Sequence, residues 1–173
     1  RDGKVLVLVN GAYGRRICKI CDYNDRNYSV YETGENIRPS PQDLLSILTS
    51  DKQITDVVVV HCETTSGILN PVEELAEVVA GAKCRLVIDA MSTFGAIKLD
   101  VKDTNCSAII ASSGKCLEGV PGIGLIIAEK ENLKISRNRS SSLSLDLYDQ
   151  WINLESSSQW RFTPPTHAVA SLD

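Results

Sequence analysis

The sequence has 173 residues, of which 43% are hydrophobic and 23% are charged, which allows one substantial core but not two large domains. The formal net charge is −4, with Lys and Arg scattered along the chain, so no basic stripe is present to follow a nucleic-acid backbone. The apolar runs are far shorter than the roughly 20 residues that span a bilayer, and the first residues lack a signal-peptide pattern. We expect one domain that binds neither nucleic acid nor a membrane.

Short runs rich in β-branched residues alternate with segments of helical spacing, which is typical of a parallel sheet covered by helices. Most of the runs are continuous, as in strands that are buried on both faces. The sequence therefore predicts an α/β fold with three layers, helix, sheet and helix, around a mainly parallel sheet. The predicted strands are 4–9, 28–32, 56–61, 85–89, 108–111 and 124–128.

Helices are predicted between the strands, at 14–21, 41–48 and 71–80. Pro41 suits a first helical turn. The third helix is expected to have Asn70 as its N-cap, Pro71 at its first position and Gly81 at its end. After residue 128 the alternation stops, and 143–173 is predicted to hold one helix followed by a proline-rich loop.

Six cysteines lie mostly inside apolar segments, which predicts reduced thiols and a cytoplasmic protein. Cys18 and Cys21 form a C-x-x-C, but a zinc site needs a second pair of ligands, and none has suitable spacing. We interpret the pair as packing residues of a helix and His61 as a packing residue at a strand end. No metal site is predicted.

Polar residues follow four of the predicted strands at their carboxyl ends, where open α/β sheets bind ligands. Tyr13 follows the first strand and Thr64 follows the third, while Asp89 ends the fourth. Lys115 follows the fifth strand through a short run of small residues. We expect these four side chains to share one edge of the sheet.

Asp89 closes an apolar run, so its carboxylate is drawn toward the interior and needs a cationic partner. A protonated pyridine nitrogen would serve, as in enzymes that use pyridoxal 5'-phosphate (PLP). The alternative is an acid that caps a following helix at Ser92 or pairs with a nearby base. Lys115 lies between small residues and the turn at 118–122, and a lysine held near a cationic, poorly solvated site can attack an aldehyde. The alternative is an exposed loop lysine.

Tyr13 has glycines on both sides, which allow a flat ring to approach its face. The alternative is a turn aromatic that packs on the end of the sheet. Thr64 and Thr65 can donate a hydrogen bond to a cofactor hydroxyl or phosphate, or can cap a local turn.

Six stretches, in this order along the chain, are more specific together than any one motif. They are LVNGAYG at 8–14, HCETTSGILNP at 61–71, DAMSTFG at 89–95, GKCLEGVPG at 114–122, SLSLDLYDQW at 142–151 and RFTPPTH at 161–167. Together they resemble the class V aminotransferases of fold type I. Within that family, the resemblance implies transfer of an amino group from 2-aminoethylphosphonate to pyruvate, so the expected partners are an amino donor and a 2-oxo acid.

The resemblance implies PLP as cofactor and a role for each matched residue. Lys115 resembles the lysine that forms the Schiff base, Asp89 the partner of the pyridine nitrogen, Tyr13 the aromatic that stacks on the ring, and Thr64 the hydroxyl that contacts the ring oxygen. Thr163 resembles a residue that reaches across a two-fold interface to the phosphate of the neighbouring subunit's cofactor. The resemblance therefore also implies a homodimer.

Two positions depart from the family pattern. Gly114 stands where the family commonly has an amide residue that helps to bind the phosphate, and Arg15 stands where an acid is common. The resemblance places a phosphate loop before Arg1 and a small C-terminal domain after Asp173. We therefore expect residues 1–173 to be a single PLP-binding fragment of the large domain, weakly active or inactive alone.

Two alternatives stay open at this point. One is a related aminotransferase that acts on alanine or serine with glyoxylate or pyruvate, because such relatives share the residues that contact PLP. The other is a non-catalytic α/β domain that serves as a structural or interaction module.

Overall fold

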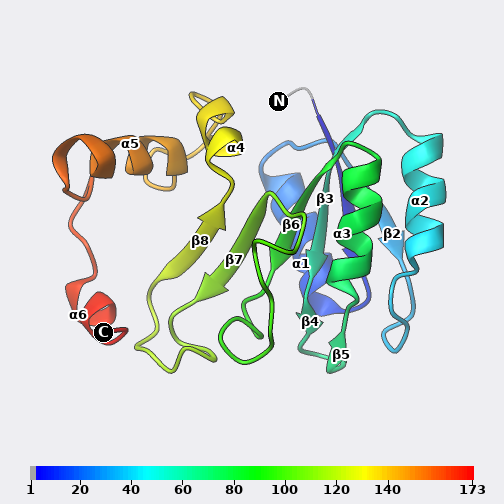
Figure 1. The fold of residues 1–173 in the computed structure, drawn as a ribbon, viewed down its shortest axis with the longest axis horizontal. Helices are drawn as coiled ribbons and strands as arrows, with labels where there is room; N and C mark the ends of the chain where they lie inside the picture. The colour runs from blue at the N-terminus through cyan, green and yellow to red at the C-terminus, as the bar shows by residue number, and fades with distance from the viewer. Residues whose placement is uncertain (1–2) are drawn as a thin grey trace.

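The computed structural model describes residues 3–173, and a six-stranded sheet forms its centre (Figure 1). The strands lie in the order β2-β1-β3-β6-β7-β8; all neighbours are parallel except β8, which runs antiparallel to β7. The predicted α/β class and mainly parallel sheet are confirmed. The strands span Lys4–Val9 (β1), Tyr28–Glu32 (β2), Ile54–Val60 (β3), Arg85–Asp89 (β6), Ala108–Ser112 (β7) and Gly124–Ala128 (β8).

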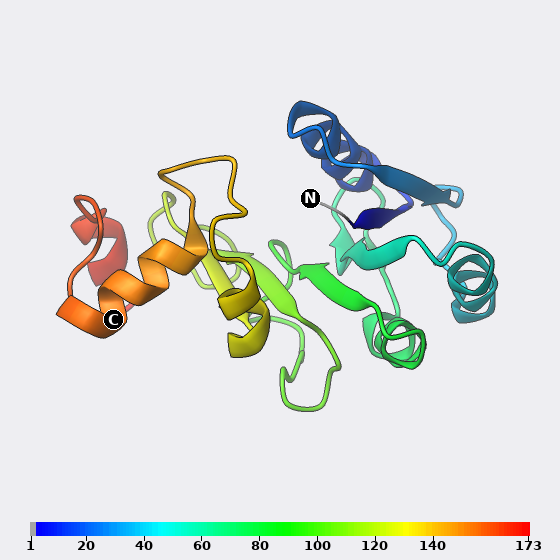
Figure 2. The ribbon, with the colours of Figure 1, turned by 90° about the horizontal axis from the view of Figure 1, so that it is seen from above.

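Helices cover both faces of the sheet, as Figure 2 shows, which confirms the three layers. One face carries α2 (Pro41–Ser50) and α3 (Val72–Gly81), and the other carries α1 (Ala12–Tyr23). Leu44 of α2 and Leu75 of α3 are buried in the main core, while Val7 and Val9 of β1 pack under α1. Burying a leucine side chain contributes about 1.5–3 kcal/mol, so the apolar face of each helix fixes it on the sheet.

The start of α2 is as predicted, but the start of α3 is not. Ser40 accepts a hydrogen bond from the amide of Asp43 at 3.4 Å, and Pro41 opens the helix. Asn70, in contrast, is not the N-cap of α3. Its buried amide donates to the carbonyl of Val60 at 2.8 Å and exchanges two hydrogen bonds with Asn10, at 2.8 and 3.2 Å.

Buried polar groups need hydrogen-bond partners. The side chain of Asn70 finds its partners inside the fold and is therefore not available to cap α3. Pro71 then occupies the cap position, and α3 begins at Val72. Gly81 is its last helical residue, and the left-handed conformation that ends the turn falls on Lys83, with φ of 59°.

Several boundaries and short elements differ from the sequence prediction. The predicted helix 14–21 extends over 12–23, strand 56–61 lies at 54–60, and strand 108–111 extends to 112. The predicted helix after residue 143 is α5 (Leu147–Ser157), but the following segment also holds a helix. The unpredicted elements are β4 (Cys62–Glu63), β5 (Ile68–Leu69), α4 (Lys130–Ile135) and α6 (Thr166–Ala170).

The cysteine pair of α1 packs against the sheet, as predicted. Cys21 is buried, Cys18 is partly buried, and both contact the cluster of Val7 and Val9. Burial raises the pKa of both thiols, so they stay protonated. All six cysteines are free, and within residues 3–173 no helix is long and apolar enough to cross a bilayer.

Candidate active site

Four of the five predicted site residues lie at one edge of the sheet, at or beyond the carboxyl ends of its parallel strands. The parallel strands β1, β3, β6 and β7 all end at the lower edge in Figure 1. Asp89 ends β6, and Lys115 follows β7, the neighbouring strand, by three residues. Tyr13 is the second residue of α1, which begins just after β1, and Thr64 lies in the turn between β4 and β5.

Asp89 points to the face of the sheet that α1 covers. Its strand alternates, and Leu86 and Ile88 point into the main core on the opposite face. The carboxylate Oδ1 accepts a hydrogen bond from the amide of Met91 at 3.0 Å. The acid therefore does cap the segment that follows, but residues 91–96 form a turn and not the helix of the alternative prediction. Within residues 3–173 it forms no ion pair.

The pKa of Asp89 is raised above its ordinary value, chiefly because burial disfavours the charged form. The negative charge of Glu63 acts in the same direction, whereas the Met91 hydrogen bond and the positive charge of Arg16 lower the pKa. The geometry therefore leaves a half-buried acid whose charge is incompletely compensated.

Lys115 lies in a loop that is fixed at its base. The hydroxyl of Ser113 donates to the carbonyl of Val120 at 2.7 Å, and the amide of Gly119 donates to the carbonyl of Ser113 at 2.9 Å. Lys115 itself is exposed, and no residue that the structure describes accepts a hydrogen bond from its amine. The Sγ of Cys116 donates to the carbonyl of Ser92 at 3.3 Å, so this loop contacts the turn that follows Asp89.

Tyr13 and Thr64 are open to solvent on the same edge. The ring of Tyr13 is partly exposed, with the guanidinium of Arg16 4.7 Å from its centroid. Thr64 is exposed and makes no hydrogen bond within the described part of the chain. Its neighbour Thr65 contacts the start of α1 and not a local turn: its Oγ1 accepts from the amide of Ala12 at 3.3 Å and donates to Glu63 at 3.1 Å.

Glu63 also follows the third predicted strand at this edge, but the sequence reasoning assigned it no role. Its side chain is fully buried, and its carboxylate accepts hydrogen bonds from the amides of Tyr13, at 3.1 and 3.2 Å, and Gly14, at 3.2 Å. One signal was available in the sequence. The residue before α1 is Gly11, which has no side chain to cap the helix, so the cap had to come from elsewhere.

Thr163 does not join the other four residues. It is exposed, in the segment between α5 and α6, which lies beyond β8 from α1 (Figure 1). Its expected role toward a neighbouring subunit stays a prediction. Arg15, the second departure from the family pattern, is exposed and pairs with Glu32 at 2.9 Å and Glu35 at 3.0 Å.

The first departure, Gly114, has a local cause. A Cβ at this position would lie 2.7–2.9 Å from atoms of Pro121, including its Cα. A side chain therefore requires the backbone of the 113–122 loop to move, and glycine is the residue that this loop accepts.

Gly114→Asn is expected to lower the free energy of unfolding by about 1–3 kcal/mol, the usual cost of an overpacked site. Urea unfolding followed by circular dichroism measures the change. Gly81→Ala is the matched control, because nothing lies within 4 Å of its added methyl group; it should leave stability unchanged or raise it. An unchanged unfolding midpoint for Gly114→Asn would show that the loop adapts freely.

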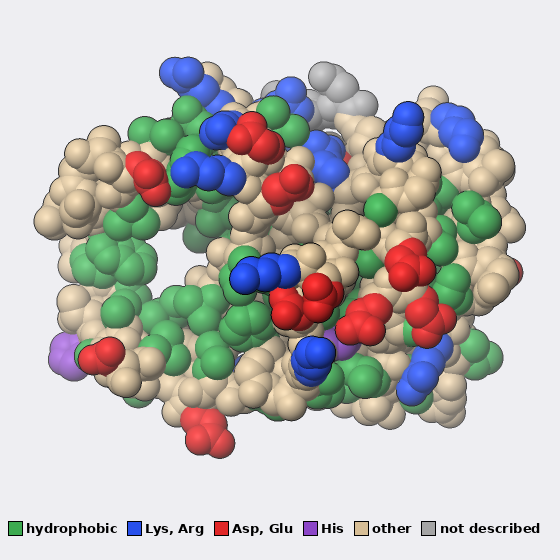
Figure 3. Space-filling view, viewed as in Figure 1, with side chains coloured by type: hydrophobic (Ala, Val, Ile, Leu, Met, Phe, Trp, Pro, Cys, Tyr) green, Lys and Arg blue, Asp and Glu red, His purple; other side chains and the backbone are tan. Residues whose placement is uncertain are grey.

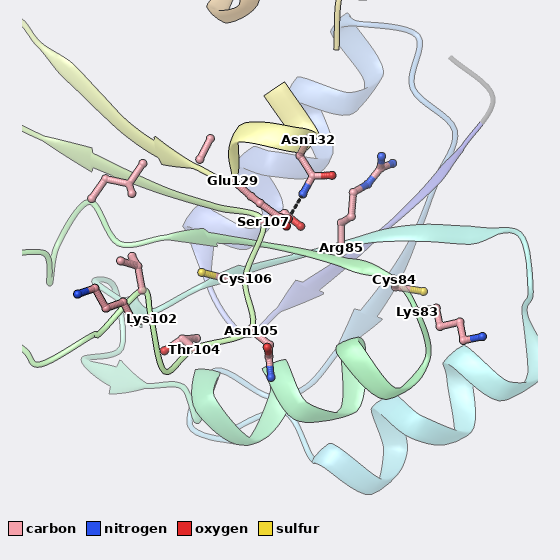
Figure 4. Close-up of a pocket in the computed structure, with 13 residues that line it drawn as sticks. Lys83, Cys84, Arg85, Lys102, Thr104, Asn105, Cys106, Ser107, Glu129 and Asn132 are labelled. Carbon is pink, nitrogen blue, oxygen red and sulfur yellow. Dashed lines mark hydrogen bonds between the residues drawn. The ribbon is translucent and has the colours of Figure 1, made fainter. Parts of the chain in front are cut away.

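A cavity of about 570 Å³ lies elsewhere, near the amino ends of β6 and β7 (Figure 4). It is lined by Arg85, Cys106, Glu129 and Asn132 among others, and by none of the predicted site residues. Ligands of open α/β sheets bind outside the carboxyl ends of the strands, so we place the candidate site at the opposite edge.

The arrangement of sheet and helices is that of the fold type I aminotransferases. Pyridoxamine–pyruvate aminotransferase from Mesorhizobium loti superposes with a TM-score of 0.89 at 25% identity, over 99% of this chain and 44% of that one. Ureidoglycine–glyoxylate aminotransferase from Bacillus subtilis also gives a TM-score of 0.89, at 22% identity over 99% and 45% of the two chains.

The family described as aminotransferase class-V matches residues 12–172, and the chain belongs to this family. A 2-aminoethylphosphonate–pyruvate transaminase of Pseudomonas fluorescens is 52% identical over 172 residues, which are 99% of this chain and 47% of the relative. One of Pseudomonas aeruginosa is 51% identical over 99% and 46%. The chain thus spans about half the length of the curated relatives it matches.

Proposed function

We propose that the protein to which this chain belongs is a PLP-dependent aminotransferase that converts 2-aminoethylphosphonate and pyruvate to phosphonoacetaldehyde and alanine. The class V family and the names of relatives at about half identity support the proposal. The observation that carries it is the placement of two residues at or just beyond the ends of neighbouring strands: Asp89, a half-buried acid whose charge is incompletely compensated, and Lys115, an exposed amine.

The residues present fit PLP. Asp89 lacks the cationic partner that a pyridinium nitrogen supplies, and the Nζ of Lys115 is open to an aldehyde. Tyr13 offers a ring face and Thr64 an unengaged hydroxyl on the same edge. When bound, PLP supplies an electron sink. With PLP bound, the Nζ of Lys115 would hold and move a proton at the substrate carbon, and the carboxylate of Asp89 would pair with the pyridine nitrogen.

The proposal extends to organisation and location. Residues 1–173 supply the PLP-binding part of a large domain, and residues elsewhere in the protein bind the phosphonate.

The protein is a homodimer in which Thr163 reaches the partner's cofactor phosphate. In support, a hollow of about 450 Å³ between α5 and β8 is lined mainly by apolar side chains, including Ile126, Trp151 and Leu154, together with Lys130, Gln150 and Glu155 (Figure 3). Six free cysteines support a cytoplasmic location.

Substrate preference tests the reaction. With the full-length protein, we expect kcat/KM for 2-aminoethylphosphonate and pyruvate to exceed that for alanine or serine by at least about 100-fold, because a site built to pair with a charged group rejects ligands that lack it. Steady-state assays with pyruvate and glyoxylate as acceptors measure this. A preference for alanine or serine would favour the related aminotransferase instead.

Cofactor labelling separates an enzyme from a non-catalytic module. PLP is titrated into the full-length protein, reduced with borohydride and located by peptide mapping. A label on Lys115 supports the enzyme, and an unlabelled protein supports the module.

A further inference from the structure

Glu63 is a buried acid whose carboxylate contacts the start of α1. Its side chain is 0% exposed, and its carboxylate receives the amides of Tyr13 and Gly14 and the hydroxyl of Thr65. A Cβ on Gly11 would lie 2.1 Å from the Cγ of Glu63. The chain therefore leaves room at Gly11 for a carboxylate that comes from another strand.

This contact replaces the missing N-cap of α1. The helix has no side-chain cap of its own and no acid in its first turn, so its first amides lack partners within the helix. Tyr13 and Gly14 are the second and third residues of the helix, and these are the amides that a capping side chain serves. A negative charge is also favourable there, because the helix dipole is positive at that end.

The same contact links two residues of the proposed cofactor site. The amide of Tyr13 donates to both oxygens of Glu63, which fixes the backbone from which the phenol ring extends. The strand that holds Glu63 is joined to the turn behind Asp89, because the hydroxyl of Ser92 donates to the carbonyl of Cys62 at 2.9 Å. Glu63 thus ties the start of α1 to the end of β6.

We infer that Glu63 is a positioning residue of the proposed PLP site: its carboxylate fixes the backbone of Tyr13 relative to Asp89 and so holds the phenol ring where the cofactor ring stacks. The inference rests on the proposed function. Glu63 itself is buried under the helix end, so it acts through Tyr13 and touches neither cofactor nor substrate.

The test uses Glu63→Gln in the full-length protein. We expect hydrogen exchange at the amides of Tyr13 and Gly14 to quicken at least about tenfold in the cofactor-free protein, because glutamine keeps the shape but not the charge. PLP affinity should fall about tenfold, as expected for a group that orients a ligand-binding residue. The visible circular dichroism of bound PLP should weaken, since that signal requires a fixed ring.

A second test variant and a control variant accompany Glu63→Gln. Thr65→Val removes one partner of the carboxylate and the acceptor of the Ala12 amide. It should give the same changes, about two- to threefold, in a protein that folds. Glu74→Gln is the matched control, because Glu74 is an exposed acid in the first turn of α3; it should change neither exchange nor affinity.

The outcomes separate the two ideas. If PLP labels Lys115 in the unaltered protein while both the Glu63 and Thr65 variants keep its affinity, dichroism and exchange rates, the positioning role is wrong. If PLP does not label Lys115 in the unaltered protein, the proposed function itself fails, and the inference falls with it.

Discussion

Lys115→Ala in the full-length protein is expected to abolish covalent attachment of PLP and to lower the rate of transamination on the order of 10⁴- to 10⁶-fold, the range for loss of a covalent nucleophile. The amine is exposed at the carboxyl edge of the sheet, on a loop whose base is fixed by Ser113. The described chain offers that amine no hydrogen-bond acceptor, so its loss should leave the fold unchanged. The absorbance of lysine-bound PLP measures the attachment.

Lys98→Ala is the matched control, because Lys98 is an exposed lysine in the segment that follows β6. It should keep the absorbance and the activity. Retention of the absorbance by the Lys115 variant would place the covalent lysine elsewhere and remove the basis of the proposed site.

The strands were predictable because their signal is local. Four of them, β1, β2, β6 and β8, have the predicted bounds, since polar or turn-forming residues end each apolar run. Parallel strands also share a direction, so the edge at which polar residues gather follows from chain order alone. That reasoning brings the segments of Asp89 and Lys115 together without knowledge of any contact between them.

Long-range pairing was not predictable in the same way. Asn70 carries a local helix-cap signal, but its side chain bonds Asn10, which is 60 residues away in the sequence. Glu63 caps a helix that begins about 50 residues earlier in the sequence, and no local sequence pattern predicts such a cap. The hairpin of β4 and β5 has two residues in each strand, too few for a periodic pattern.

Family resemblance supplied roles that geometry alone leaves open. The structure places Tyr13, Thr64, Asp89 and Lys115 at one edge, yet an exposed lysine and an exposed threonine are common in any protein. The alternation of β6 adds a physical argument for Asp89, because it turns the carboxylate away from the main core toward the α1 face.

Asp89→Asn is expected to affect stability and activity in opposite directions. The pKa of Asp89 is raised in the folded chain, chiefly by burial and also by the charge of Glu63. Below the unfolded pKa of about 4, both states hold the proton and the acid has no effect. As the pH rises from there to the folded pKa, only the unfolded state gains from ionisation, so the cofactor-free protein loses stability.

Asparagine does not ionise and retains an oxygen for the amide of Met91. The cofactor-free Asp89→Asn protein should therefore have a higher Tm than the unaltered protein at pH 7, and the difference should shrink toward pH 4. With PLP bound the order should reverse, because only the carboxylate pairs with a pyridinium nitrogen. Turnover should fall on the order of 10²- to 10³-fold, as for loss of one electrostatic contact to the reacting group.

Calorimetry at several pH values, with and without PLP, measures the changes in Tm, and steady-state assays measure turnover. Asp100→Asn is the control, because Asp100 is exposed and accepts a hydrogen bond from the amide two residues on, Lys102, at 2.9 Å, as Asp89 does from Met91. It should leave Tm and turnover unchanged. If PLP raised the Tm of the Asp89 variant and of the unaltered protein equally, Asp89 would not be the partner of a cofactor cation, and burial alone would account for its raised pKa.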